Sequence, residues 1–144
     1  MLTITRLRPG VIGVALAALL ACGSFALAES ISLRADLKGA NEQPPVNGNA
    51  TGTLTATYDT AAKKLSWTVN YSGLTGNATG AHFHGAGPND KTPDVVGYLV
   101  SPLRGSANLT DRQASDLTAG RWYFEIETAA NPKGEIRGPV QQAK

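Results

Sequence analysis

The chain has 144 residues, of which 42% are hydrophobic and 17% charged, and its formal net charge at pH 7 is +2. Arg6 and Arg8 account for this excess, because without them 11 of the 13 basic residues remain against 11 acidic residues. A neutral surface without a basic cluster argues against nucleic acid or an anionic membrane as the partner.

Residues 1–28 have the pattern of a secretory signal peptide. Two arginines precede an apolar run at residues 11–21, and Ala26-Leu27-Ala28 places small residues at the positions that a signal peptidase recognises. The run is shorter than the ~20 residues that a membrane span needs. We therefore expect cleavage after Ala28, which leaves one domain at residues 29–144 in the periplasm or the medium.

Cys22, the only cysteine, allows a second interpretation of this segment. Leu19-Leu20-Ala21-Cys22 loosely resembles a bacterial lipoprotein box, although Leu20 stands where a small residue is expected. Cleavage after Ala28 would leave no cysteine and hence no disulfide, so that the fold would depend on its core alone. A lipidated Cys22 would instead hold the protein at a membrane surface.

Short segments that alternate apolar and polar residues, separated by Gly, Pro and Asn, dominate the rest of the chain. This alternation predicts strands at residues 31–37, 51–58, 65–71, 79–84, 95–100, 121–128 and 135–140. Four aromatic residues on these strands, Trp67, Tyr71, Trp122 and Phe124, are expected in the core.

One helix is predicted between the last two pairs of strands. Thr110 is placed to cap its N-terminus, Gln113 follows three residues later as in a capping box, and Leu117 and Gly120 close it. Residues 105–109 are expected to lead into this helix. About seven short strands with a single helix predict an all-β fold, an antiparallel β-sandwich or barrel.

The only two histidines, His82 and His84, lie one residue apart on a predicted strand, directly before a glycine turn. Side chains at positions i and i+2 of a strand point to the same face, about 7 Å apart at the backbone. The two imidazoles would thus stand side by side, as two nitrogen ligands of a metal ion do. In the other interpretation, both form hydrogen bonds within the sandwich and fix the turn.

Five motifs follow one another after residue 38. They are Gly39-Ala40-Asn41-Glu42-Gln43-Pro44-Pro45-Val46, Ala50-Thr51-Gly52, Ala81-His82-Phe83-His84, the segment from Leu109 to Gly120 with Tyr123 after it, and Asn131-Pro132-Lys133-Gly134-Glu135-Ile136-Arg137-Gly138. Together they resemble the chordin-type, or CHRD, domain family. The resemblance implies a secreted, immunoglobulin-like β-sandwich, and in chordin such domains belong to an extracellular antagonist of growth factors. We therefore expect an exported, non-enzymatic binding or structural domain, whose extracytoplasmic partner the sequence does not identify.

The resemblance also bears on the histidine pair. Many members of the family carry a histidine where this chain has Glu127, in a segment like Val-His-Thr. If that histidine is a metal ligand, Glu127 is its oxygen-bearing replacement, and His82, His84 and Glu127 form a candidate metal site. Asp94 is the other candidate for an oxygen ligand. Copper or zinc suits these ligands, which gives an alternative function as a metal-binding extracytoplasmic protein, with or without redox activity.

Other chemistries lack their residues in this sequence. The histidine pair faintly resembles the His-Xaa-His strand of copper/zinc superoxide dismutases, but no further histidine is available for two metals. No serine lies in a nucleophile-elbow context, and no phosphate-binding fingerprint is present. Catalytic residues are therefore not assigned.

Two pairs of charged residues are expected to have structural roles. Glu125 and Glu127 lie at i and i+2 of one strand, and we expect both on its solvated face, opposite the apolar residues. Glu135 and Arg137 also share a face, and we expect them to pin the C-terminal strand to the loop at residues 41–42.

Overall fold

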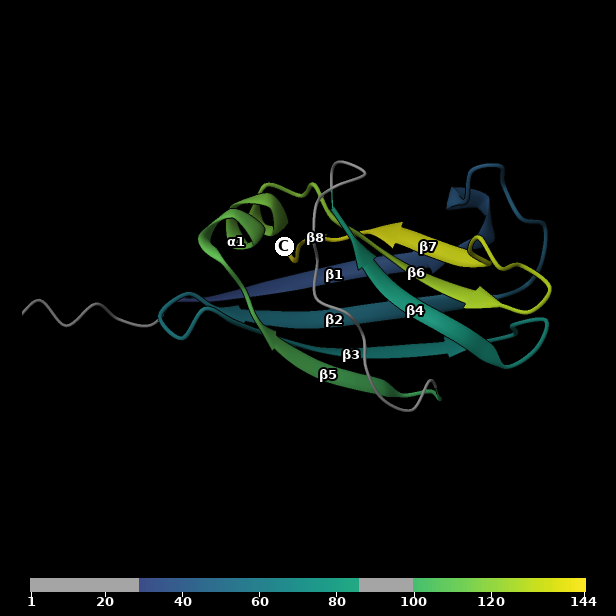
Figure 1. The fold of residues 1–144 in the computed structure, drawn as a ribbon, viewed down its shortest axis with the longest axis horizontal. Coiled ribbons are helices and arrows are strands. Elements are labelled where there is room, and N and C mark those ends of the chain that lie inside the picture. Colours follow the sequence, from purple (N-terminus) through teal and green to yellow (C-terminus); the bar gives the residue numbers. More distant parts are fainter. Residues whose placement is uncertain (1–28, 86–99) are drawn as a thin grey trace, which may run out of the picture.

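The computed structural model describes residues 29–85 and 100–144, which fold mainly as antiparallel β-sheet (Figure 1). Its strands are β1 (Ser30–Lys38), β2 (Thr51–Asp59), β3 (Lys64–Ser72), β4 (Ala78–His84), β5 (Leu103–Asn108), β6 (Tyr123–Thr128), β7 (Ile136–Pro139) and β8 (Gln141–Gln142). The short 3-10 turn η1 (Gly39–Asn41) follows β1, and the helix α1 (Asp111–Thr118) precedes β6.

The described strands belong to one sheet with the order β4-β6-β7-β1-β2-β3-β5, and β8 pairs with β1. The sheet curls, so that β4, β6 and β7 form a second layer across β1, β2, β3 and β5 (Figure 1). The predicted all-β, sandwich-like fold is confirmed. Its two layers are joined by the pairing of β7 with β1, where Lys38 lies opposite Arg137.

The core lies between the two layers. In the paired strands β1, β2 and β3 alternate residues face inward, as the alternation of the sequence requires, and hydroxyl-rich residues face outward. The buried residues of these three strands are Leu33, Ala35, Leu37, Leu54, Ala56, Tyr58, Leu65, Trp67 and Val69.

Aromatic rings connect the layers. Trp67 of β3 meets Phe83 of β4 edge-on, with ring centroids 5.1 Å apart, and Phe83 in turn contacts Phe124 at 4.8 Å and Trp122 at 5.7 Å. The predicted core positions of Trp67, Trp122 and Phe124 are confirmed. Tyr71 is only half-buried and packs against the margin of the core.

The predicted helix and its capping box are also confirmed. The Thr110 side chain accepts a hydrogen bond from the backbone of Gln113, whose side chain accepts one from the backbone of Thr110. Leu117 is the buried residue of α1, and Gly120, with a positive φ of 70°, ends the turn that follows. The helix lies at one end of the sandwich beside β8 (Figure 1).

Residues 105–109 differ from the expectation, because most of them belong to strand β5 rather than to an approach to the helix. β5 pairs with β3, and Gly105 lies opposite Trp67. A Cβ at Gly105 would overlap the Trp67 indole ring. The small residue therefore makes room for the largest side chain of the core, and it removes the apolar alternation that identifies a strand.

Two other predictions fall outside the described residues. The signal segment at residues 1–28 is one, and the strand expected at residues 95–100 is the other, except for Val100, which lies in a bend. Within residues 29–85 and 100–144, no helix has the length and apolar character needed to cross a membrane.

Candidate functional site

The outer face of β4, β6 and β7 gathers most of the ionisable residues that the sequence singled out. On β4, Ala81 and Phe83 face the core, so His82 and His84 point outward together, with ring centroids 6.0 Å apart. The expectation that the two imidazoles share one face is thus confirmed. On β6 the outward positions belong to Tyr123, Glu125 and Glu127, and on β7 to Arg137.

Each histidine reaches diagonally across to a glutamate of β6. His82 lies opposite Glu125 in the register, but its Nε2 atom is 3.6 Å from Oε1 of Glu127. Gly80 makes room for this pair, since a Cβ there would lie 2.9 Å from the His82 Nε2 atom. The His82 side chain is 41% exposed and that of Glu127 is 25% exposed, so this pair is open to solvent.

His84 occupies a more enclosed position. Its ring stacks on Tyr123, with centroids 4.6 Å apart and planes within 8° of parallel. Its Nε2 atom lies 3.2 Å from Oε2 of Glu125, yet it is buried and makes no hydrogen bond. The carboxylate beside His84 is therefore that of Glu125, whereas Glu127 lies beside His82.

The expected solvated position of Glu125 is wrong, because this residue is only 5% exposed. Glu42, which follows η1 and is 4% exposed, covers it from one side. The two carboxyl groups meet above Gly134, where a Cβ would lie 2.7 Å from Oε1 of Glu125 and 2.8 Å from Oε2 of Glu42. Gly134 has a φ of 117°, which favours glycine, and so it supplies both the turn and the space.

Arg137 connects this carboxyl pair to the β-sheet. Its Nε atom donates to the Asn41 carbonyl at 2.7 Å, and the Asn41 side chain donates back to the Arg137 carbonyl at 2.9 Å. The same Nε lies 3.5 Å from Oε2 of Glu42, and Nη1 lies 4.0 Å from Oε1 of Glu125. The guanidinium group also lies over the Tyr123 ring, 5.1 Å from its centroid. The prediction that Arg137 pins its strand to the loop at residues 41–42 is confirmed.

Burial and like charge make the carboxyl pair hard to ionise. Burial, followed by the neighbouring charge of Glu125, raises the pKa of Glu42 to about 7, although Arg137 acts in the opposite direction. Burial likewise raises the pKa of Tyr123. Ionisable groups in such surroundings are frequent at functional sites.

Glu135 has a different role from the one expected. It is 2% exposed and, instead of contacting the loop at residues 41–42, accepts hydrogen bonds from the backbone and hydroxyl of Thr75, from Thr128 and from Asn131, at 2.6–3.2 Å. Burial alone would raise the pKa of Glu135, but these hydrogen bonds outweigh it and lower the pKa. Glu135 therefore fastens the Thr75 loop and the turn before β7.

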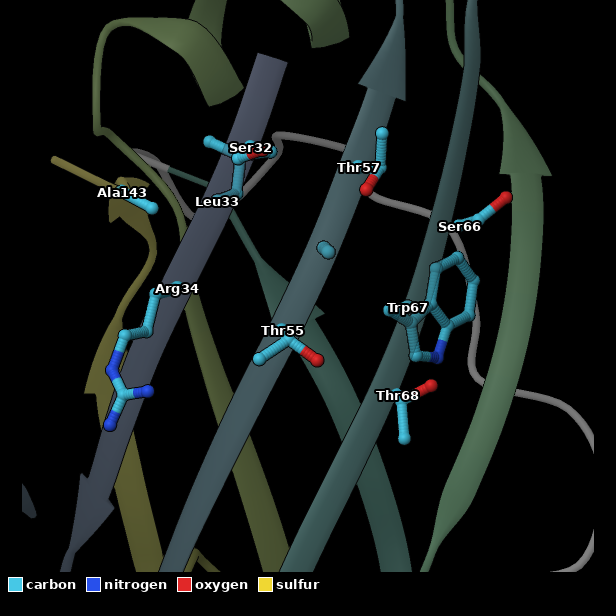
Figure 2. A pocket seen from close by; sticks show the side chains of 10 residues that line it. Ser32, Leu33, Arg34, Thr55, Thr57, Ser66, Trp67, Thr68 and Ala143 are labelled. Carbon is cyan, nitrogen blue, oxygen red and sulfur yellow. The ribbon is translucent and has the colours of Figure 1, made fainter. Parts of the chain in front are cut away.

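Two hollows lie on the two layers. One of about 250 Å³ adjoins the Arg137–Tyr123 contact and is lined by Asn41, Gln43, Tyr123, Arg137, Gly138 and Pro139. The other, of about 490 Å³, lies over β1, β2 and β3 (Figure 2). It is bordered by the hydroxyl groups of Ser32, Thr55, Thr57, Ser66 and Thr68. Its charged residue, Arg34, is paired with Asp36 at 2.7 Å, so we regard this hollow as a polar surface.

Comparison with known proteins identifies the family. The model of the CHRD domain matches residues 33–140, which include the sheet from β1 to β7 and all residues of the outer face described above. The chain belongs to the CHRD domain family. Searches of curated proteins and of solved structures found no match.

In this CHRD domain, the predicted metal ligands are brought to one face but are not gathered around one point. Among residues 29–85 and 100–144, no group of three His, Cys, Asp or Glu side chains is arranged to hold a metal ion. Asp94, the other predicted oxygen ligand, lies outside these residues. His82 with Glu127 and His84 with Glu125 are instead two adjacent imidazole–carboxylate pairs.

Sequence reasoning missed the buried Glu42–Glu125 pair of the CHRD domain. The hydrogen bonds that bring η1 to β7 join residues 96 positions apart in the chain, a distance that no local pattern spans. The available signal was Glu42 itself, an acidic residue within the first family motif, because a charge there needs a partner elsewhere in the fold.

Proposed function

We propose that this CHRD domain is an exported, non-enzymatic binding or structural domain. The family match supports a non-enzymatic domain, and the pattern of residues 1–28 supports export. The observation that carries a binding role is the outer face of β4, β6 and β7. It combines exposed charged pairs with a hollow beside Arg137 and Tyr123, none of which the aromatic core requires.

A capture experiment tests this function. The full chain, tagged at its C-terminus, is cross-linked in the expressing cells, and the attached molecules are compared with those of two double variants. His82→Ala with Glu127→Gln alters the outer face, and Thr55→Ala with Thr57→Ala alters the opposite layer as a control. We expect a partner that the wild type and the control variant retain and the outer-face variant loses. Equal capture by all three proteins would contradict a binding role of this face.

Metal binding is a second candidate function, favoured by the same-face placement of His82 and His84 with Glu127 beside His82. If these three residues bind copper(II) or zinc, the full chain takes up one ion. Its affinity falls as the pH drops through about 6.5, because imidazole must be neutral to bind a metal. His82→Ala and His84→Ala should each abolish uptake, and Glu127→Gln should weaken it. A calorimetric titration without saturable heat for either metal would exclude this candidate.

A further inference from the structure

Three glutamates are buried on the β4–β6–β7 side of the domain, and they differ in how well they are satisfied. Glu135 accepts hydrogen bonds from three residues, as a buried carboxylate must if its burial is not to destabilise the fold. Glu42, in contrast, has a buried Oε1 atom without a hydrogen-bond partner. The buried Nε2 atom of His84 is also without one. Unsatisfied buried polar atoms are rare in native proteins and call for an explanation.

The unsatisfied atoms belong to one cluster. Nε2 of His84 lies 3.2 Å from Oε2 of Glu125, and Oε1 of Glu125 meets the Glu42 carboxyl above Gly134. Because Gly134 has no side chain, the space between the two carboxyl groups is not filled by a Cβ. The cluster thus offers an imidazole nitrogen and two carboxyl groups around a gap in the packing.

The charge of the cluster favours a cation. Two carboxylates face one guanidinium group, that of Arg137, whose nearest nitrogen atoms are 3.5 Å from Glu42 and 4.0 Å from Glu125. Arg137 is also committed to Asn41, to which it donates at 2.7 Å. One negative charge is left without a counter-ion, and in the metal-free protein it is suppressed by a proton, as the raised pKa of Glu42 indicates.

We propose that Glu42, Glu125 and His84 bind a divalent transition-metal ion of the zinc or copper(II) class. Mixed imidazole and carboxylate ligands suit these ions. The three donors do not yet surround one point, so binding requires the Glu42 carboxyl to turn toward His84. This rotation sacrifices no hydrogen bond of Oε1, because that atom makes none. The inner site shares His84 with the metal-binding alternative above but uses neither His82 nor Glu127.

Matched variants distinguish the inner site from the outer one. The full chain is titrated with Zn²⁺ and with Cu²⁺ in a calorimeter, alongside Glu42→Gln, Glu125→Gln, His82→Ala and Glu127→Gln. We expect Glu42→Gln and Glu125→Gln to weaken binding at least about tenfold, and the other two variants to bind as the wild type does. Unchanged binding in folded Glu42→Gln and Glu125→Gln would overturn the inner site. Loss of binding only in His82→Ala and Glu127→Gln would do so as well, while supporting the outer site.

A spectroscopic measurement on the wild type tests the proposal without any variant. The inner site contains one imidazole, and the outer site contains two. Electron paramagnetic resonance of the protein with one equivalent of Cu²⁺ should therefore show coupling to a single ligand nitrogen. Coupling to two nitrogens, or the absence of a protein-bound copper signal, would overturn the inner site. Neither result would bear on the capture experiment, so the binding role and the metal site fail independently.

Discussion

Glu42 and Glu135 show how the surroundings of one residue type decide its effect on stability. Both are nearly inaccessible to solvent, but the pKa of Glu42 is raised and that of Glu135 is lowered. The difference arises from hydrogen bonds, since Glu135 has donors at both of its oxygens and Glu42 faces another carboxyl group. The two residues therefore give the folding free energy opposite dependences on pH.

Glu135 should stabilise the fold at neutral pH and cease to do so in acid. Its pKa in the folded protein lies below the ordinary value of 4.5, so its contribution is complete above pH 4.5 and is lost as the pH falls through the folded value. Glu135→Gln should lower the unfolding free energy at pH 7 by about 3 kcal/mol, because charged hydrogen bonds are lost. The deficit should shrink below pH 4.5. Urea unfolding at several pH values measures both effects, and a deficit that does not change with pH would contradict this role.

Glu42 should act in the opposite direction in the metal-free protein. Its carboxyl holds a proton more tightly in the folded chain than in the unfolded chain, so the unfolding free energy falls as the pH rises from about 4.5 through about 7. Glu42→Gln should match the wild type at pH 5 and exceed its stability at pH 8 by about 2 kcal/mol. The measurement is urea unfolding in the presence of a chelator. Glu127→Gln, which changes an exposed carboxyl, is the control, and a Glu42→Gln variant that is less stable at pH 8 would refute the prediction.

Among the elements, β5 depends most on a single small residue. Gly105 lies opposite Trp67, and its missing side chain is the space that the indole ring fills. The contact holds an edge strand to β3 and at the same time completes the aromatic core.

Gly105→Ala should therefore destabilise the fold by about 2–3 kcal/mol, because Trp67 must leave its position or β5 must separate from β3. Gly48→Ala is the matched control, since an added Cβ there meets no atom within 4 Å. Thermal unfolding of the two variants provides the comparison. Equal midpoints would show that the core adapts to an additional methyl group at this position.

The elements that the sequence predicted well are those with clear local patterns. The alternation in β1, β2 and β3 and the capping box of α1 correspond to observed strands and an observed helix, because those residues alone determine which face is apolar and where the helix begins. β5 was missed because Gly105 and Ala107 weaken the alternation. In the candidate site, the shared face of His82 and His84 follows from a local pattern, whereas the burial of Glu125 depends on Glu42, far away in the sequence.

At the scale of the whole molecule, the position of the mature N-terminus decides where the domain works. If residues 1–28 are a signal peptide, intact-mass and N-terminal peptide analysis of the exported protein should place its first residue at Glu29. Comparison with the protein retained in the cytoplasm provides the control. A lipid-modified Cys22 at the N-terminus would contradict this prediction and place the domain on a membrane surface.

The pairing of the first strand with the last two also affects the order in which the sheet can assemble. Lys38 pairs with Arg137, and Leu33 pairs with Gln142, so the two layers become continuous only through contacts that span about a hundred residues. A chain shortened before residue 136 would leave the β7 side of β1 without its neighbour and expose hydrogen-bonding groups that attract other strands. Incomplete copies of this protein should therefore self-associate, and the last nine residues act as the clasp that makes the sheet safe from aggregation.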